Sequence, residues 1–157
     1  MIKVVPSSGI DPDPVLLVST DPADLDIALI HRFLSEQSGW ARGIARELVE
    51  TSIANSLCFG GFLDGRQIAF ARVVTDYATY GNLVDVFVLP AHRGQGHAKT
   101  LMRAVMAHPR LQGLRRFTLN TVDAHRVYAA FGFGPPRKPE TAMEIYRPGM
   151  YERAGDA

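Results

Sequence analysis

Apolar residues in the first third of the chain follow the period of a strand and then that of helices. Residues 15–19 form a short apolar run, which predicts a buried strand. Asp21 and Pro22 predict a helix start, because aspartate caps free N–H groups and proline suits the first helical position. Apolar residues near the helical period extend this helix to about Leu34 and predict a second helix over residues 42–54.

The middle of the chain has the pattern of an antiparallel meander. Strands are predicted over residues 57–63 and 67–74, on either side of Asp64-Gly65, which is a strong signal for a two-residue hairpin. A third strand is predicted over residues 83–89, and Pro90 ends it.

Helix and strand patterns alternate in the last third. Periodicity predicts a helix over residues 98–108, a strand over 116–121 and a short helix over 124–131. Gly132 can adopt the left-handed conformation that ends such a helix. Weak alternation over residues 141–146 predicts a last strand. This order of elements predicts an α+β fold, with a mixed sheet and helices packed on it.

The composition is that of one domain spanning residues 1–157, with an irregular lead-in over 1–14 and a loose tail over 147–157. Hydrophobic residues make up 46% and charged residues 21%, near the averages of globular proteins. The formal net charge of +1 gives no support for a nucleic-acid partner or a polybasic membrane binder. The single Cys58 excludes an intrachain disulfide, and we expect no metal because no metal-ligand spacing is present. No apolar run approaches the roughly 18 residues of a membrane span and the N-terminus lacks a signal-peptide pattern, so we expect a cytoplasmic protein without a membrane partner.

The segment after the third meander strand carries the clearest chemical signal. The strand ends at Pro90, Gly94 and Gly96 follow, and an amphipathic helix begins at once. Backbone N–H groups at such a junction have no helical partner and lie at the positive end of the helix dipole, which suits a phosphate. Arg93 and Lys99 add positive charge nearby. Two glycines taken alone fit a plain strand-to-helix connection better, and their spacing matches neither a Walker loop nor a dinucleotide fingerprint.

Two motifs give this segment a more specific meaning. Residues 93–98 read Arg-Gly-Gln-Gly-His-Ala and match the Arg/Gln-x-x-Gly-x-Gly/Ala pyrophosphate loop of the GNAT superfamily of acyl-CoA N-acyltransferases. Residues 123–133 are similar to the superfamily's Ala-x-x-Leu-Tyr-x-x-x-Gly-Phe segment. Over residues 55–134 the chain therefore resembles this superfamily, and more narrowly its small bacterial members of undefined substrate.

The resemblance implies a fold and an activity. The fold is a GNAT-like antiparallel meander plus a splayed parallel strand pair, with helices on both faces. The activity is transfer of an acetyl group from acetyl-CoA, as co-substrate, to a primary amine by direct attack in a ternary complex. A non-catalytic acyl-CoA-binding regulatory module would share the loop and is the alternative. A small-molecule or peptide amine is the expected acceptor, and a homodimer is implied only at the level of the superfamily.

The resemblance also implies which residues bind the coenzyme. The pantetheine arm would lie in the gap beside the third meander strand, and a backbone N–H near its end would polarise the thioester carbonyl. An ordinary core strand is compatible with this role, because the backbone binds while the side chains pack. The residues implied are Val86, Phe87 and Val88 for the arm, and Arg93, Gly94, Gln95, Gly96, His97, Ala98 and Lys99 for the pyrophosphate.

Tyr128 and Asp85 are the candidate catalytic residues. Tyr128 matches the superfamily's tyrosine that protonates or hydrogen-bonds the departing sulfur; a packed helix tyrosine is the alternative. Proton transfer from a phenol to a thiolate runs uphill by roughly 2 kcal/mol in water, which favours the hydrogen bond. Asp85 is an acid in an apolar strand and a candidate base, and alternation places it on one face with Leu83 and Phe87. A paired structural carboxylate or an anchor for the substrate ammonium is at least as consistent.

Three aromatic residues are candidates for walls of the acceptor pocket: Trp40, Tyr77 and Tyr80. Core packing for Trp40 and coverage of the core edge for the two tyrosines are the alternatives. Thr121 stands where the superfamily often has asparagine, and a cap of the following helix is its expected role.

Overall fold

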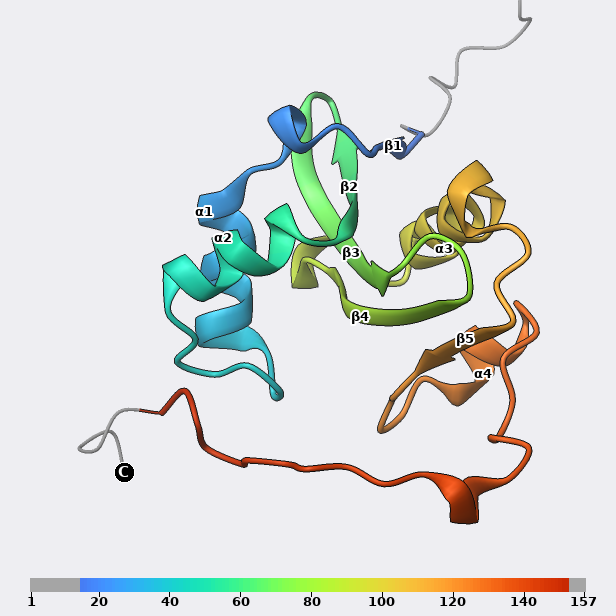
Figure 1. The fold of residues 1–157 in the computed structure, drawn as a ribbon. Coiled ribbons are helices and arrows are strands. Elements are labelled where there is room, and N and C mark those ends of the chain that lie inside the picture. Colours follow the sequence, from blue (N-terminus) through green and yellow to red (C-terminus); the bar gives the residue numbers. More distant parts are fainter. Residues whose placement is uncertain (1–14, 153–157) are drawn as a thin grey trace, which may run out of the picture.

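Five strands of the computed structural model, which describes residues 15–152, form one mixed sheet (Figure 1). The predicted lead-in over 1–14 and the last five residues of the predicted tail lie outside the described residues. Strands β1 to β4 are antiparallel neighbours and β5 is parallel to β4, so the order in the sheet follows the chain. The strands are β1 (Leu17–Ser19), β2 (Leu57–Leu63), β3 (Arg66–Thr75), β4 (Tyr80–Val88) and β5 (Arg116–Leu119).

Helices cover both faces of the sheet, as the α+β prediction requires. The α-helices are α1 (Ile27–Arg32), α2 (Arg46–Ala54), α3 (His97–Ala107) and α4 (His125–Ala129). Short 3₁₀ or π turns join them: η1 (Pro22–Asp24), η2 (Phe33–Gln37), η3 (Pro90–His92), η4 (Pro109–Leu111) and η5 (Pro139–Thr141).

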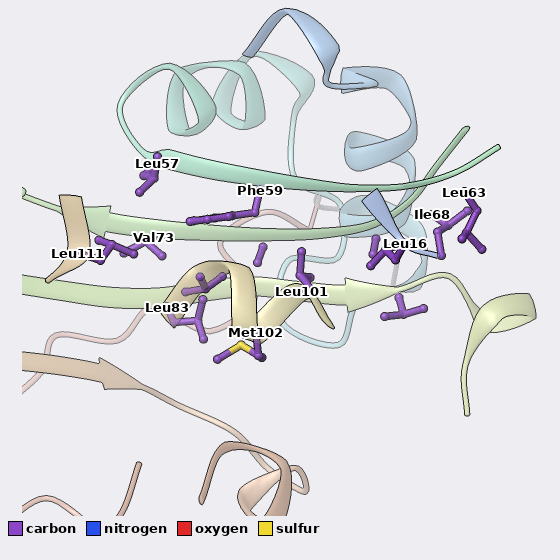
Figure 2. Close-up of a cluster of buried hydrophobic side chains, with 14 residues drawn as sticks. Leu16, Leu57, Phe59, Leu63, Ile68, Val73, Leu83, Leu101, Met102 and Leu111 are labelled. Carbon is purple, nitrogen blue, oxygen red and sulfur yellow. The ribbon is translucent and has the colours of Figure 1, made fainter. Parts of the chain in front are cut away.

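Two hydrophobic clusters, one on each face, hold the helices to the sheet. On one face, Ile30 and Val49 from α1 and α2 are buried with Phe70 and Phe87. The first is called the α1–α2 side. On the other face, α3 packs its apolar stripe on β2 to β4, and Figure 2 shows Leu101 and Met102 of α3 in this second cluster, the α3-side cluster. Its other labelled members are Leu16, Leu57, Phe59, Leu63, Ile68, Val73, Leu83 and Leu111.

The β2–β3 hairpin confirms the prediction from Asp64-Gly65. Both residues have positive φ, 48° and 75°, which is the conformation of a type I′ turn. Aspartate and glycine tolerate this region better than most residues, and the turn's twist matches that of the strands. The meander therefore follows directly from local sequence.

The first predicted helix is broken into three pieces in the structure. Leu25 is extended, and the Asp26 carboxylate accepts the Leu29 N–H at 2.9 Å, so a new helix starts there. The predicted second helix begins at Arg46 instead of residue 42, since Gly43 has a φ of 78° that no right-handed helix includes. Both differences come from local backbone bonding that apolar spacing does not report.

The predicted last strand over residues 141–146 is wrong. The chain makes the short η5 turn and then runs through residues 142–147, the C-terminal arm, without pairing to a described strand. Figure 1 shows this arm (red) passing below the sheet. Alternation records which side chains share a face, but a strand also needs a neighbour for its backbone groups. Beyond the arm, the Tyr151 carbonyl lies so close to Gly43 that a Cβ there would be 2.6 Å from its oxygen.

Candidate active site

The parallel strands β4 and β5 separate after a short paired stretch. They pair only from Tyr80 with Arg116 to Leu83 with Leu119, while β4 continues to Val88 beside β3 alone. Within the described part of the chain no strand lies against this last part of β4 on its β5 side. The predicted splay is confirmed, and Val86, Phe87 and Val88 lie in the part of β4 that borders the gap.

A bulge in β4 changes the face of the sheet on which the side chains beside the gap lie. Arg72 is opposite Val84 and Phe70 is opposite Phe87, so one residue on β3, Ala71, faces two on β4, Asp85 and Val86. Asp85, at the bulge, has a φ of 54°, a region that aspartate and asparagine enter more readily than other non-glycine residues. The predicted alternation is therefore wrong: Leu83 joins the α3-side cluster, whereas Phe87 joins the α1–α2 side.

The loop from β4 to α3 presents a row of backbone N–H groups. His92 and Arg93 donate theirs to Leu89 and Pro90, and Thr100 donates to Gly96. Between them, the six amides from Gly94 to Lys99 donate to no atom of residues 15–152. The row begins the 11-residue helix α3, at the positive end of its dipole, and is therefore suited to an anion.

Gly94 and Gly96 keep this row open. Their φ angles are 74° and 83°, and a Cβ built on either would meet nothing within 4 Å. A side chain at either position would strain the backbone and occupy the space in front of the amides. The loop therefore fits a diphosphate, which approaches the backbone directly.

The side chains around the loop divide into two kinds. Arg93 donates from Nε to the Val88 carbonyl at 3.0 Å and so ties the loop to the end of β4. Lys99 and Gln95 are exposed and lie beside the amide row. His97 is 8% exposed and its Nε2 has no partner among the described residues, so it offers a ligand its backbone amide and not its ring.

Tyr128 lies on the α3 side of the sheet, on the short helix α4. Its ring packs edge to face on that of Phe133, with the two ring centroids 6.2 Å apart. The Phe133 N–H donates to the Tyr128 carbonyl, and Gly132 between them has a φ of 94°. The predicted turn at Gly132 is confirmed. Burial, with a smaller contribution from Asp123, raises the pKa of the Tyr128 phenol above its ordinary value of 10. A higher pKa makes proton transfer to a thiolate more unfavourable, so Tyr128 is suited to donate a hydrogen bond and keep its proton.

The predicted cap of α4 by Thr121 is wrong in its position. Thr121 Oγ1 accepts the N–H of Ala124, the residue before α4, at 3.0 Å, and within the described residues the first turn of α4 has no side-chain cap. The threonine that departs from the superfamily pattern therefore has a structural contact that explains its presence.

On the opposite face, Asp85 joins three parts of the chain. Its Oδ1 accepts from Trp40 Nε1 at 2.9 Å, and its Oδ2 accepts from Arg72 Nε and Nη2 at 2.9 and 2.8 Å. Arg72 also donates to Ser56 Oγ at 3.0 Å. Both carboxylate oxygens are thus occupied, as in the paired structural alternative. The assignment of Asp85 as a base stays a prediction.

A pocket of about 400 Å³ opens beside this ion pair. Trp40, Arg72, Asp85 and Tyr151 line it together with residues of α2. Its size suits a small molecule and its wall mixes apolar and polar groups. Asp85 lies in the part of β4 that has separated from β5. The pocket and the gap between β4 and β5 are therefore both next to β4.

Of the three predicted aromatic walls, only Trp40 lines this pocket. Tyr77 packs on the α3-side cluster with Arg110 3.5 Å above its ring, and the Tyr80 hydroxyl bonds Thr118 Oγ1 at 2.7 Å. A turn at Asp76 fixes where the side chains of Tyr77 and Tyr80 lie. Asp76 Oδ1 accepts the N–H groups of Ala78, Thr79 and Tyr80.

Sequence reasoning missed Arg72 and Tyr151. Arg72 is a charged residue inside an apolar strand, as Asp85 is, and this shared feature was an available signal for an ion pair. Tyr151 reaches the pocket through the path of the C-terminal arm, for which the sequence carries no signal.

A larger cavity of about 470 Å³ lies at the hairpin end of the sheet, with Asp26, Gln67 and His92 in its wall. The Asp26 carboxylate caps α1 and Gln67 bonds backbone groups of Asp26 and Ala69. These polar groups serve the fold, so we place the chemistry at the splay.

Residues 15–152 contain neither a metal-ligand cluster nor a membrane-spanning helix. No group of three or more His, Cys, Asp or Glu side chains is arranged to hold a metal ion. Within the same range, no helix has the length and apolar character needed to cross a bilayer.

The Arg72–Asp85 pair gives a stability prediction. Arg72→Met leaves a carboxylate that is 11% exposed without its cation, so we expect a loss of about 3–5 kcal/mol in the free energy of unfolding. Arg46→Ala breaks the exposed Arg46–Glu50 pair and should cost less than about 1 kcal/mol. Urea unfolding measures both. Adding Asp85→Asn to Arg72→Met should recover part of the loss, and equal costs for the two single variants would contradict the buried pair.

Comparison with known proteins agrees with this geometry. The family model described as "Acetyltransferase (GNAT) family" matches residues 50–133. A protein of Gibberella zeae provisionally named an acetyltransferase is 31% identical over 134 residues, covering 71% of this chain and 75% of that protein. The chain belongs to the GNAT acetyltransferase family.

Solved structures give the same result for the fold. A crystal structure from Xanthomonas campestris pv. campestris, provisionally described as a GNAT-family acetyltransferase, is 61% identical with a TM-score of 0.87, over 89% of this chain and 99% of that one. An aminoglycoside N-acetyltransferase solved in complex with CoA has a TM-score of 0.62 at 20% identity, over 88% of this chain and 97% of that one. The second likeness concerns the fold alone.

Proposed function

We propose that the protein transfers the acetyl group of acetyl-CoA to a primary amine by direct attack within a ternary complex. The observation that carries the proposal is the row of six unoccupied amides from Gly94 to Lys99, placed at the open end of the β4–β5 splay. The diphosphate of CoA would bind this row and the pantetheine arm would lie along Val86 to Val88. This arrangement brings the thioester to the end of β4.

The reaction balances with the groups at hand. The amine nitrogen forms a bond to the thioester carbonyl carbon, the carbon–sulfur bond breaks, and a proton lost by the amine appears on the CoA thiol. A backbone N–H near Val88 would stabilise the developing oxyanion, worth about 3 kcal/mol at the barrier. Tyr128 would donate a hydrogen bond to the departing sulfur.

The acceptor would enter from the pocket beside Asp85. A volume of about 400 Å³ supports a small-molecule amine more than an extended protein segment. The amine must be neutral to attack: at pH 7 this costs about 4.6 kcal/mol for an amine of pKa about 10.4 and about 1 kcal/mol for one near 7.7.

The test is an acceptor screen with two readouts. Purified protein, acetyl-CoA and a panel of amines should release thiol and yield a product heavier by one acetyl group, detected by mass spectrometry. Calorimetry with acetyl-CoA alone separates the alternatives. Tight binding without turnover on any amine would favour a non-catalytic acyl-CoA-binding module, and no binding would contradict both.

Asp85→Asn distinguishes a base from a pocket wall. Asparagine accepts the same backbone conformation and keeps the bond from Trp40, but it leaves Arg72 without its anion, so the variant loses stability and is assayed at a temperature where urea unfolding shows it to be folded. We expect the KM of the acceptor to rise about tenfold, as one charge-assisted contact is lost, with little change in the shape of the pH–rate profile. Asp64→Asn, at the exposed hairpin with a φ of 48°, is the matched control. Loss of the ascending limb in Asp85→Asn would instead assign the base to Asp85.

A further inference from the structure

A turn near the C-terminus brings Tyr151 to the acceptor pocket, whose volume is about 400 Å³. This C-terminal turn comprises residues 148–152, in which the Glu152 N–H donates to the Gly149 carbonyl at 3.1 Å and Gly149 has a φ of 67°. The preceding residues 143–147 form no backbone hydrogen bond with another described residue. The position of Tyr151 therefore depends on the contacts of the turn itself.

Gly43, in the loop before α2, supports this turn (Figure 1). A Cβ at Gly43 would lie 2.6 Å from the Tyr151 carbonyl oxygen and 3.6 Å from the Cα of Glu152. The turn thus occupies the space that a side chain would need, and only glycine fits. The Gly43 N–H donates to the Ser35 carbonyl at 2.9 Å, so the support is itself fixed to η2.

The rest of the pocket wall is mostly apolar and carries no net charge. Its charged residues are Arg72 and Asp85, which pair with each other at 2.8 Å. The Thr51 and Ser52 hydroxyls donate to carbonyls of their own helix, α2. A polycationic acceptor would gain no net attraction from such a wall, whereas an amine with a compact apolar body would fill it. The apolar members besides Tyr151 are Leu34, Trp40, Ala41, Ile44, Leu48 and Val74.

We propose that Tyr151 is the specificity-determining wall of the acceptor pocket, that it restricts the acceptor to amines with a compact apolar body, and that Gly43 positions it. The ring limits how far the body of a bound amine extends from Asp85. A longer body has to displace the C-terminal turn and loses the contacts of the turn with Gly43. The inference rests on the acetyl transfer proposed above, because it names the substrate class of the same site.

Trp40 provides a measure of binding in this pocket that needs no turnover. It is the single tryptophan of the chain and lines the pocket, so a bound amine should change its fluorescence. Titrations with n-butylamine and n-octylamine give two dissociation constants, whose ratio measures the size limit. Tyr151→Ala should bind n-octylamine about tenfold more tightly and change the affinity for n-butylamine less than about threefold, because roughly two more methylene groups are then buried. No fluorescence change with either amine, or an unchanged ratio, would overturn the proposal.

Gly43→Ala tests the positioning. The added Cβ should displace the turn and shift the ratio in the same direction as Tyr151→Ala, with the affinity for CoA changed less than about threefold. Gly113→Ala is the matched control, since Gly113 has the same φ of 78° and nothing within 4 Å of its Cβ position. Tyr146→Ala removes an exposed ring that does not line the pocket. The wild-type ratio in Gly43→Ala, or a shifted ratio in either control, would overturn the proposal.

The acceptor screen separates a failure of this inference from a failure of the proposed function. If both amines are acetylated with the same relative kcat/KM in the wild type and in Tyr151→Ala, acetyl transfer stands and the role of Tyr151 is overturned. If the fluorescence ratio shifts as expected but no amine of the panel releases thiol, acetyl transfer is contradicted and Tyr151 stands as the wall of an amine-binding pocket.

Discussion

Gly96→Val will weaken the affinity for CoA at least about 100-fold while the protein stays folded. Valine at a φ of 83° strains the loop, and its side chain enters space that is open in front of the amides. Loss of two hydrogen bonds to a charged phosphate, at about 1.5–3 kcal/mol each, accounts for a change of this size. Calorimetry with CoA measures it.

Gly113→Val is the matched control for this substitution. Gly113 has a φ of 78° and open space around its Cβ position, but it lies in the turn before β5. The two variants should therefore lose similar thermal stability, and only Gly96→Val should lose CoA binding. Equal affinities for CoA would remove the loop from the binding site.

Tyr128→Phe will lower kcat about 100-fold and change the affinity for CoA by less than about threefold. In the proposed mechanism the lost hydroxyl would donate to the departing sulfur, which gains negative charge as the carbon–sulfur bond breaks. The ring still packs on Phe133, so the fold and the ground-state complex should persist. Steady-state kinetics and calorimetry separate the two effects. Tyr146→Phe, with an exposed ring, is the control, and an unchanged kcat in Tyr128→Phe would remove the assigned role.

The raised pKa of Tyr128 fixes the sign of the pH dependence. The phenol acts in its protonated form, which persists up to its pKa, and burial moves that pKa above 10. The rate should therefore rise with pH as the acceptor amine is deprotonated and show no descending limb from Tyr128 below pH 10. A fall in rate between pH 7 and 10 that Tyr128→Phe abolishes would contradict this.

The sequence was sufficient where the physics is local. Asp64-Gly65 placed the hairpin, the stripe around Leu101 placed α3, and Gly94 and Gly96 marked a loop whose amides are unoccupied in the structure. In each case the backbone geometry depends on residues adjacent in the chain.

Features that depend on distant residues were not predictable in this way. The bulge at Asp85 arises from the register with β3, and it separates Leu83 from Phe87, which simple alternation had placed together. The contacts of Asp85 with Arg72 and Trp40 bring together positions far apart in sequence. Alternation predicts a strand over the arm, but the arm is unpaired, because alternation carries no information on whether a neighbouring edge exists.

Nuclear magnetic resonance of the backbone amides tests the central claim most directly. With ¹⁵N-labelled protein, CoA should shift the amide signals of Gly94 to Lys99 strongly, as expected for new hydrogen bonds to the diphosphate. Pantetheine, which lacks the diphosphate, should shift signals of β4 near Val86 and leave those six in place. Unchanged signals from Gly94 to Lys99 at saturating CoA would contradict the account.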